Sequence, residues 1–264
     1  MTTLTAPATA GPTWIDTVRA ERQKMFSVRS TWWTLAAIVV LGAGLTTIIC
    51  AASAEWLASG DADEAVGSFI TWGMMIAQVG AVALGALIIT TEYGSGQIRS
   101  TFAATPSRGR VLAAKALVVT VVLFLVGTVT ALLGYAGGNW FLDREGIGLA
   151  LEGDVLRSMY GSGLYLAGLG LMSLGVGFIL RHTAGVISLM LALVFVVSGM
   201  APLIPGTVGD WIEKLVPGSA GASIATPVTF DPNLLEPWVG YGVFLAEVTA
   251  VLAIAWVLVK RRDA

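Results

Sequence analysis

Six long runs of apolar residues constrain the fold of this chain more than any other feature of its sequence. Each run approaches or exceeds the ~20 residues that a helix needs to cross the hydrocarbon core of a bilayer. Charged residues make up only 12% of the chain, about half of their usual share in soluble domains. The sequence therefore predicts an all-α polytopic membrane protein with six transmembrane helices. The predicted spans are Trp33–Ala54, Phe69–Thr91, Val111–Tyr135, Ser158–Leu180, Ala184–Ile204 and Val239–Val259.

The cations are sorted between the two sets of segments that flank these runs. Of the 15 Lys and Arg residues, all but Arg144, Arg157 and Lys214 fall in segments that share a side with both termini. Cytoplasmic segments of membrane proteins are enriched in Lys and Arg. We therefore expect a multi-pass protein of the cell membrane with both termini in the cytoplasm.

The chain before the first span divides into two parts. Residues 1–13 are rich in Ala, Thr and Pro and predict a disordered tail rather than a cleaved signal peptide. Residues 14–32 have helical periodicity and predict an amphipathic helix in the membrane interface; the alternative is a soluble helix packed on a partner protein. Residues 33–259 are expected to form one transmembrane domain, followed by a cytoplasmic tail, 260–264. The apolar arc of the interfacial helix contains Trp14, Ile15, Val18, Met25, Phe26 and Val28.

Glycines recur every seven residues in the fourth span, in two series about half a turn apart. Small residues allow neighbouring membrane helices to pack closely. Two opposite stripes of this kind predict that the fourth helix lies at the centre of the bundle. The two series are Gly161, Gly168 and Gly175, and Gly163, Gly170 and Gly177.

One clear ionisable residue, Glu247, lies within a predicted span, about 12 Å from its outer end at helical rise. Such residues are costly in a bilayer and suggest a functional role. Glu247 is therefore a candidate for a substrate path, together with Gln78 of the second span. The alternative is a structural hydrogen bond from Glu247 to Gln78, Tyr241 or a neighbouring subunit.

The segment between the last two spans is long and partly apolar. Trp211, Ile212, Leu215 and Val216 fit one face of a short helix that ends at Pro217. This pattern predicts an amphipathic or re-entrant element before the sixth span, since irregular backbone at membrane depth must be covered by protein.

The sequence predicts no catalytic or metal site. A phosphate-binding loop needs a Gly-Lys pair, and the chain contains none. The single histidine, His182, is expected at the membrane edge, and most of a span separates it from Ser162, which argues against an intramembrane hydrolase. The single cysteine, Cys50, excludes an intramolecular disulfide and a cysteine cluster. We therefore assign no catalytic residue and no directly bound cofactor.

A compact segment of mixed charge, "TTEYGSGQIRSTFAATPSRGRVLAAK", separates the second and third spans. Ile98 and Phe102 are four residues apart and share a helix face. Glu92 precedes this face, where a carboxylate favours the positive end of a helix, or pairs with a nearby arginine. The segment predicts a short cytoplasmic helix whose apolar pair docks in a partner's cleft; the alternative is a solvated loop. The candidate arginine partners of Glu92 are Arg99, Arg108 and Arg110.

Three stretches of the chain resemble actinobacterial permeases of the ABC-2 transporter type. They are "RAERQKMFSVRSTWW", "TEYGSGQIRSTFAATPSRGRVLAAK" and "LVPGSAGASI". The first departs from the usual pattern, because Met25 and Phe26 stand where a Leu-Arg pair is common. With six spans at matching positions, the resemblance covers nearly the whole chain.

The resemblance implies the transmembrane permease subunit of an ATP-binding cassette exporter. Such a subunit works with a second permease, identical or different, and with a separate cytoplasmic ATPase that binds ATP and Mg. Its substrate is expected to be a hydrophobic or amphipathic small molecule, such as a drug, an antibiotic or a lipid-like compound, moved outward. No nucleic-acid partner is expected. The residues implied to couple to the ATPase are Glu92, Ile98, Arg99, Phe102 and Arg108.

Two other classes of function compete with the exporter interpretation. One is a non-transporting membrane assembly or sensor protein, whose cytoplasmic segment recruits a partner other than an ATPase. The other is an intramembrane enzyme, which the missing catalytic residues disfavour. An ATPase encoded next to this chain would favour the exporter.

Overall fold

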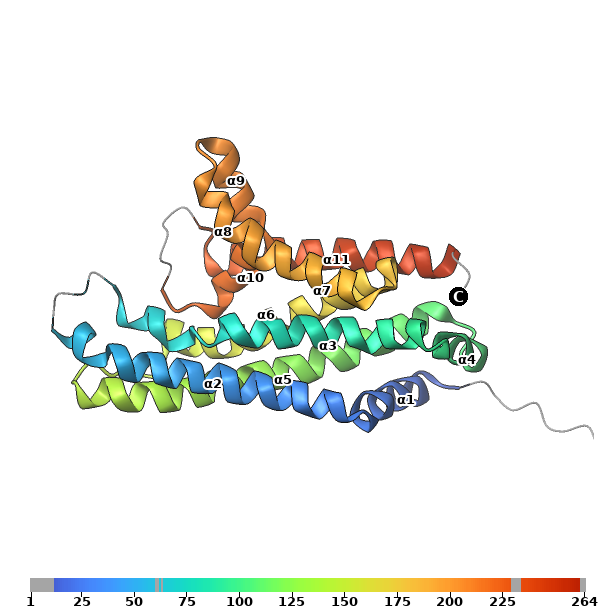
Figure 1. Cartoon of the computed structure of the whole chain (residues 1–264), viewed down its shortest axis with the longest axis horizontal. Helices are drawn as coiled ribbons and strands as arrows, with labels where there is room; N and C mark the ends of the chain where they lie inside the picture. The colour runs from blue at the N-terminus through green and yellow to red at the C-terminus, as the bar shows by residue number, and fades with distance from the viewer. Residues whose placement is uncertain (1–11, 60–61, 63, 229–233, 262–264) are drawn as a thin grey trace, which may run out of the picture.

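The computed structural model describes residues 12–59, 62, 64–228 and 234–261, and these residues contain helices and no strand. The helices form one elongated bundle (Figure 1). Most of the predicted 1–13 tail lies outside the described residues, as does most of the predicted 260–264 tail.

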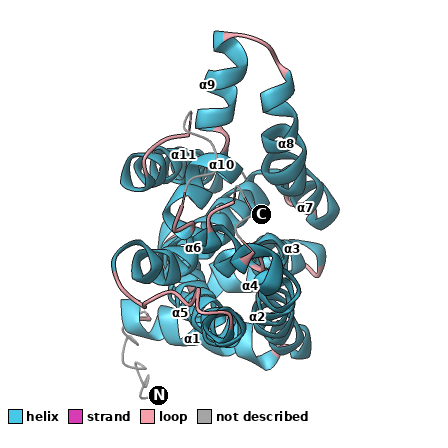
Figure 2. Ribbon diagram, turned by 90° about the vertical axis from the view of Figure 1, so that its left-hand side faces the viewer, coloured by secondary structure: helices cyan, strands magenta, loops and turns pink. Residues whose placement is uncertain are grey.

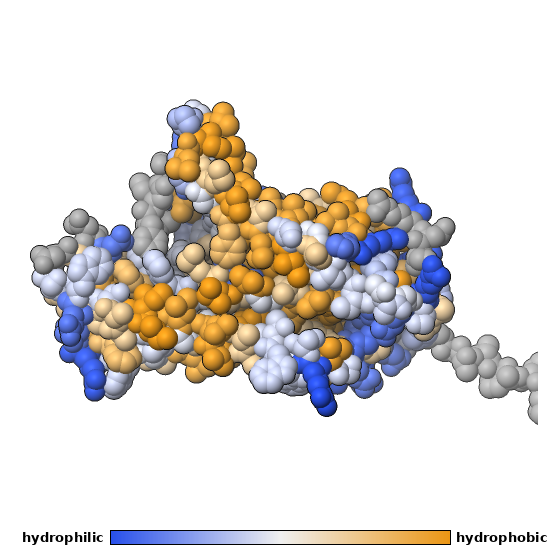
Figure 3. All heavy atoms as spheres, in the orientation of Figure 1, coloured by the Kyte–Doolittle hydropathy of each residue, from blue (hydrophilic) through white to orange (hydrophobic). Residues whose placement is uncertain are grey.

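Six helical segments of the described chain are long and apolar enough to cross a membrane. The prediction of a helical protein with six such segments is therefore confirmed. Figure 3 shows apolar surface along the middle of the bundle and hydrophilic residues gathered toward its two ends. The six segments are α2 (Arg29–Ala58), η1 with α3 (Val66–Thr71 and Met74–Gly94), α5 (Arg108–Arg144), α6 (Gly153–Leu180), the broken helix Thr183–Leu203, and α11 (Pro237–Arg261).

Helix α1 (Trp14–Ser27) is separate from α2 because Val28 adopts an extended conformation between them. The predicted 14–32 helix is therefore too long at its C-terminal end. Thr13 and Asp16 form a capping box at the start of α1, which satisfies backbone N–H groups that lack helical partners.

The buried face of α1 differs from the predicted apolar arc. Its buried residues are Thr17, Glu21 and Met25, whereas Trp14 and Ile15 are exposed. Glu21 faces inward because it bonds with a buried lysine of α5. The relation of the exposed apolar residues to a membrane interface stays a prediction.

Helix α6 lies at the centre of the bundle, as its glycines predict. It is the most buried of the six segments. Gly168 and Gly175 face Phe244 and Val251 of α11, so a methyl group at either position would overlap those side chains. The second series faces α5 and α3: Gly163 lies against Phe124, Gly170 against Leu123, and Gly177 against Ile89.

The fifth membrane-length segment is broken along its length. It consists of α7 (Thr183–Leu191), a π-helical stretch η2 (Ala192–Val197), α8 (Ser198–Met200) and η3 (Ala201–Leu203). Short helices follow where a single element is predicted. They are α9 (Thr207–Leu215), α10 (Pro217–Ala222) and η4 (Ser223–Ala225).

Helix α9 projects from the side of the bundle together with α8 (Figures 1 and 2). The segment returns to the bundle at η4, where the Arg157 guanidinium of α6 holds the chain. Arg157 donates to the carbonyl oxygens of Ile224 and Thr226 at 3.2 and 3.1 Å. A re-entrant position in a membrane stays a prediction.

Helix α1, α4 (Gln97–Ala104) and the C-terminal end of α11 gather at one end of the bundle (Figure 1). We call this the α4 end. An even number of antiparallel crossings brings the beginning and the end of the described bundle to the same side.

Candidate functional site: a buried ion network at the α4 end

Four charged side chains from three helices meet at the α4 end. Helix α1 contributes Glu21 and Lys24, α3 contributes Glu92, and α5 contributes Lys115. Lys115 has no exposed surface. Its ammonium donates to Glu21 Oε2 at 2.6 Å, to Glu92 Oε1 at 2.7 Å and to the Ile88 carbonyl at 3.3 Å. We call these four residues the ion network.

Lys24 connects the ion network to α4. Its ammonium donates to Glu21 Oε1 at 2.8 Å, to Glu92 Oε1 at 3.1 Å and to Thr101 Oγ1 of α4 at 3.0 Å. Burial lowers the pKa of the Lys24 amine, but the hydrogen bonds and negative charges of Glu21 and Glu92 outweigh it, so the pKa is raised. Lys24 is therefore protonated at neutral pH and donates all three of its N–H groups.

The charges of the ion network balance, with two ammonium groups and two carboxylates. Desolvating charges is expensive, so a buried pair is retained only with close geometry and satisfied hydrogen bonds. Removing one partner leaves an uncompensated buried charge, which costs about 3–5 kcal/mol. The ion network therefore holds α1, α3, α4 and α5 in one arrangement.

The partners of Glu92 correct the sequence prediction. Glu92 bonds with Lys24 and Lys115, not with Arg99, Arg108 or Arg110, which the sequence predicts as its possible partners. The reason is its burial: Glu92 is 5% exposed and lies in the last turns of α3. Lys115 had a signal that was missed, because it is a charged residue inside the predicted span Val111–Tyr135.

Helix α4 is the predicted short helix between the second and third spans. It begins after Gly96, whose positive φ of 73° suits a glycine at a sharp change of direction. Its apolar pair is not the predicted docking surface, since Ile98 is 2% exposed and packs in the core. Phe102 is half-buried, with the Arg108 guanidinium 5.4 Å from its ring centre.

The outward face of α4 is made of small and polar residues. Gln97, Arg99, Ser100 and Ala103 are exposed. A groove of about 560 Å³ runs between α1 and α4. It is lined by Pro12, Asp16, Thr17, Ala20, Glu21, Lys24, Gln97, Ser100, Thr101, Ala104 and Thr105.

Arg108 begins α5 and also reaches α11. Its guanidinium donates to the Val259 carbonyl at 3.3 Å. Of the predicted coupling residues, Glu92 and Ile98 are thus internal, Arg99 is exposed, and Phe102 and Arg108 lie together between α4 and α11.

A cavity of about 410 Å³ lies farther along the bundle, between α3, α6, α10 and the π-helical stretch. Gln78 lines it and accepts a hydrogen bond from the buried Tyr165 hydroxyl at 2.6 Å. None of the described residues that line it is formally charged. They are Ser68, Thr71, Trp72, Met74, Met75, Gln78, Tyr165, Val194, Phe195, Ser198, Gly199, Gly218, Ser219, Ala222, Ala225 and Thr226.

Glu247 is not among the residues that line this cavity. Its Oε2 atom is buried and has no hydrogen-bond partner among the described residues. The carbonyl oxygen of the Gln78 side chain bonds with Tyr165 instead. Gln78 and Glu247 therefore do not line the same cavity.

Comparison with known proteins adds no relative. No protein-family model matches the chain, and no curated protein matches it. The resemblance to ABC-2 permeases thus stays a prediction.

Proposed function

We propose that this chain is the transmembrane permease subunit of an ATP-driven exporter in the cell membrane, with the α4 end in the cytoplasm. The observation that supports this most is the bond between Lys24 and Thr101. It links the short helix α4 to the ion network, whose residues lie on the longer helices α1, α3 and α5. ATP and Mg would be bound by a separate ATPase subunit, and a second permease would complete the transporter.

The ion network makes α4 a suitable place for a partner to act. A displacement of α4 changes the position of Lys24, which is bonded to both carboxylates. Those carboxylates hold Lys115 of α5. Movement of α4 is therefore passed to α1, α3 and α5 through short charge-assisted bonds, which are stronger than neutral hydrogen bonds.

The surface offered to the ATPase is the exposed face of α4 and the groove beside it. It contains Arg99, Gln97 and Ser100, with Phe102 at its edge. A polar surface of this kind suits a subunit that binds and releases during a transport cycle, since transient interfaces are more polar than obligate ones. Ile98 acts from inside, by fixing α4 on the bundle.

The cavity near Gln78 suits the substrate. Its volume of about 410 Å³ falls within the usual range of about 300–1,000 Å³ for small-molecule sites. Its walls combine Trp72, Met75 and Phe195 with a few polar groups. Because no described lining residue is charged, we propose a hydrophobic or amphipathic substrate without a buried formal charge.

Purification from native membranes tests the proposal. We expect an ATPase to co-purify in mild detergent, and ATP-dependent movement of an amphipathic dye in vesicles that contain both subunits. A variant with Met75→Trp, which narrows the cavity, should keep the ATPase and lose dye movement. A chain that purifies without an ATPase and moves no dye would contradict the proposal and favour a non-transporting assembly protein.

A further inference from the structure

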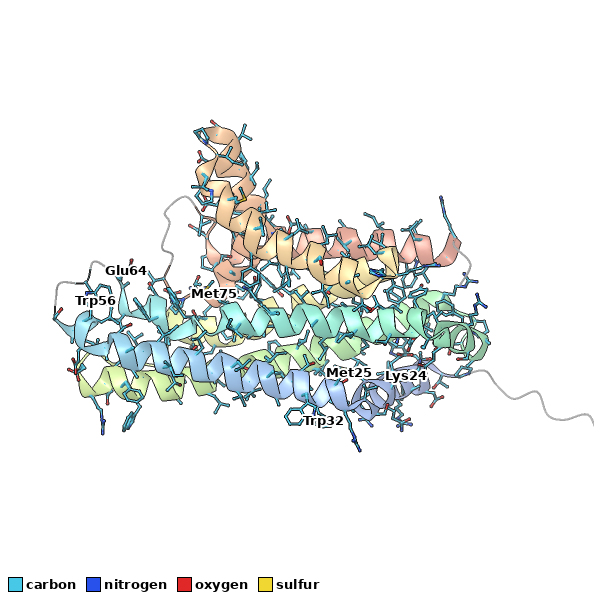
Figure 4. All side chains as sticks on the ribbon, in the orientation of Figure 1. Lys24, Met25, Trp32, Trp56, Glu64 and Met75 are labelled. Atoms are coloured by element: carbon cyan, nitrogen blue, oxygen red, sulfur yellow. The ribbon has the colours of Figure 1, made fainter. Side chains whose placement is uncertain are left out.

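A second cavity, of about 110 Å³, lies beside the ion network where α1 meets α2. We propose that it binds the hydroxyl group of an uncharged polyol, either the head of a lipid or a free molecule, on Glu92. Lys24, Met25 and Trp32 lie together around this junction (Figure 4). The lining residues are Lys24, Met25, Val28, Ser30, Thr31, Thr34, Leu84, Leu87, Ile88, Thr91, Glu92, Gln97 and Lys115.

One oxygen of the ion network remains without a partner. Both oxygens of Glu21 accept hydrogen bonds, and so does Glu92 Oε1. Glu92 Oε2 is buried and has no hydrogen-bond partner within the described part of the chain. An unsatisfied buried carboxylate oxygen is costly, and Glu92 lines the cavity, so this atom is where a ligand would bond.

The ligand must donate a hydrogen bond. An ammonium group has three N–H donors, and those of Lys24 and Lys115 already have three acceptors each. The hydroxyls of Thr34 and Thr91 donate to the carbonyls of Ser30 and Leu87. Their oxygens are therefore left as acceptors for a ligand. An ionised phosphate or carboxylate has no hydrogen to donate to Glu92 Oε2, so it is excluded as the bonded group.

The donor carries no formal charge. The ion network is already neutral, and the Lys115 ammonium lies 2.7 Å from the other oxygen of the same carboxylate. A cation on Glu92 Oε2 would thus be placed close to a buried like charge, in a setting of low dielectric where repulsion is strong. A hydroxyl group satisfies Oε2 without adding charge.

The walls of the cavity fit an amphiphile. Leu84, Leu87 and Ile88 supply an apolar side. Trp32 and Trp33, on the first turns of α2, are 58% and 77% exposed, and tryptophans of this kind gather at membrane interfaces. The cavity would then open at headgroup depth, where a glycerol-type head inserts its hydroxyls and leaves its chain in the bilayer.

The test uses the full chain in nanodiscs of phosphatidylcholine, a lipid without hydroxyl groups. Monooleoylglycerol is titrated in, and bound lipid is measured by native mass spectrometry. We expect saturable binding that the dimethyl ether of the same lipid does not reproduce. Binding of free glycerol with similar affinity would assign the site to free polyols, whereas binding of the lipid alone would assign it to a headgroup.

Two variants connect binding to the cavity. Glu92→Gln places an amide N–H₂ donor where the free oxygen was, and should abolish binding. Thr34→Val removes a lining hydroxyl without touching the ion network, and should weaken binding about fivefold or more, the loss of one hydrogen bond. The matched control is Thr249→Val, whose hydroxyl bonds only with its own helix in α11. Equal binding by the ether, no binding by either polyol, or unchanged affinity in Thr34→Val would overturn the proposal.

Discussion

Lys115 is the residue on which the α4 end of the bundle depends. It is a fully buried cation, and three acceptors from α1 and α3 surround its ammonium group. Its stem occupies the core, and its charge, together with that of Lys24, balances two carboxylates. A neutral residue of similar size would keep the packing of the stem but lose the positive charge. Such a substitution separates the contribution of packing from that of charge.

We predict that Lys115→Met destabilises the protein by about 3–5 kcal/mol, because Glu21 and Glu92 remain buried with one cation fewer. Thermal unfolding in detergent measures this. The double variant Lys115→Met with Glu92→Gln should regain part of the loss, since neighbouring substitutions are not additive. Lys260→Met, at an exposed position of α11, is the control and should change little. A loss no larger than that of the control would show that the ion network is not essential to stability.

The bonding partners of Glu92 were harder to predict than the importance of Glu92 itself. The sequence pointed to Glu92 but not to its partners, because Lys24 lies 68 positions and Lys115 lies 23 positions away from it. Which cation meets a carboxylate depends on how each helix is rotated about its axis. Hydropathy does not determine that rotation for helices whose lipid-facing and core-facing sides are both apolar.

At the scale of elements, the two apolar residues of α4 differ in how far they are buried. Ile98 and Phe102 share a helical face by spacing, yet only Ile98 is fully enclosed. The short helix packs on α3, and residues four apart differ by about 40° around its axis, so a small rotation decides which residue is covered.

Ile98→Ala and Phe102→Ala should therefore act differently. Ile98→Ala leaves a cavity in the core and should cost about 2–5 kcal/mol of stability. Phe102→Ala should cost less stability but weaken ATPase binding, because Phe102 lies at the edge of the exposed face. Unfolding temperature and ATPase co-purification, measured on both variants, separate the effects. Normal ATPase binding by Phe102→Ala would remove that residue from the interface.

Close helix packing makes a second prediction at this scale. A methyl group on Gly85 of α3 would overlap the backbone of Gly170 in α6, which no side-chain rotation relieves. Gly85→Ala should thus destabilise by about 1–3 kcal/mol. Gly44 of α2 is a helical glycine with no atom near such a methyl group, so Gly44→Ala should be neutral or slightly stabilising. Equal unfolding temperatures for the two variants would contradict the observed α3–α6 contact.

The elements themselves were largely predictable. Long apolar runs have few alternatives to membrane-length helices, and the glycine stripes located α6 at the centre. The break in the fifth segment was not predicted. One short helix was predicted after it, and α9 ends at Leu215 close to that prediction, but α10 and η4 were not expected. They depend on distant contacts, such as the Arg157 guanidinium on the carbonyls near η4, that leave no periodic pattern in the sequence.

At the scale of the whole molecule, the charge distribution predicts an orientation that can be measured directly. We expect a cysteine at Glu152 to react with an impermeant maleimide on intact cells, and a cysteine at Ser107 to react only after permeabilisation. Both positions are exposed. Ser107 directly precedes α5, and Glu152 directly precedes α6, which starts at the other end of the bundle. The native Cys50 is buried and should stay unlabelled, which supplies the background. Labelling of the Ser107→Cys variant from outside would reverse the orientation and exclude a cytoplasmic ATPase at α4.

The length of α5 allows it to couple the two ends of the bundle. Its 37 residues extend about 55 Å, well beyond the ~30 Å hydrocarbon core of a bilayer. One uninterrupted helix thus carries Lys115 near one end and, near the other, Tyr135, whose hydroxyl bonds with the Leu149 carbonyl. If a ligand that binds at one surface shifts this helix and so changes affinity for a partner at the other, linkage requires that the partner change the ligand's affinity by the same factor. Under the proposed orientation, a binder raised against the loops at the far end of α5 would then report on, and regulate, the proposed ATPase without touching it.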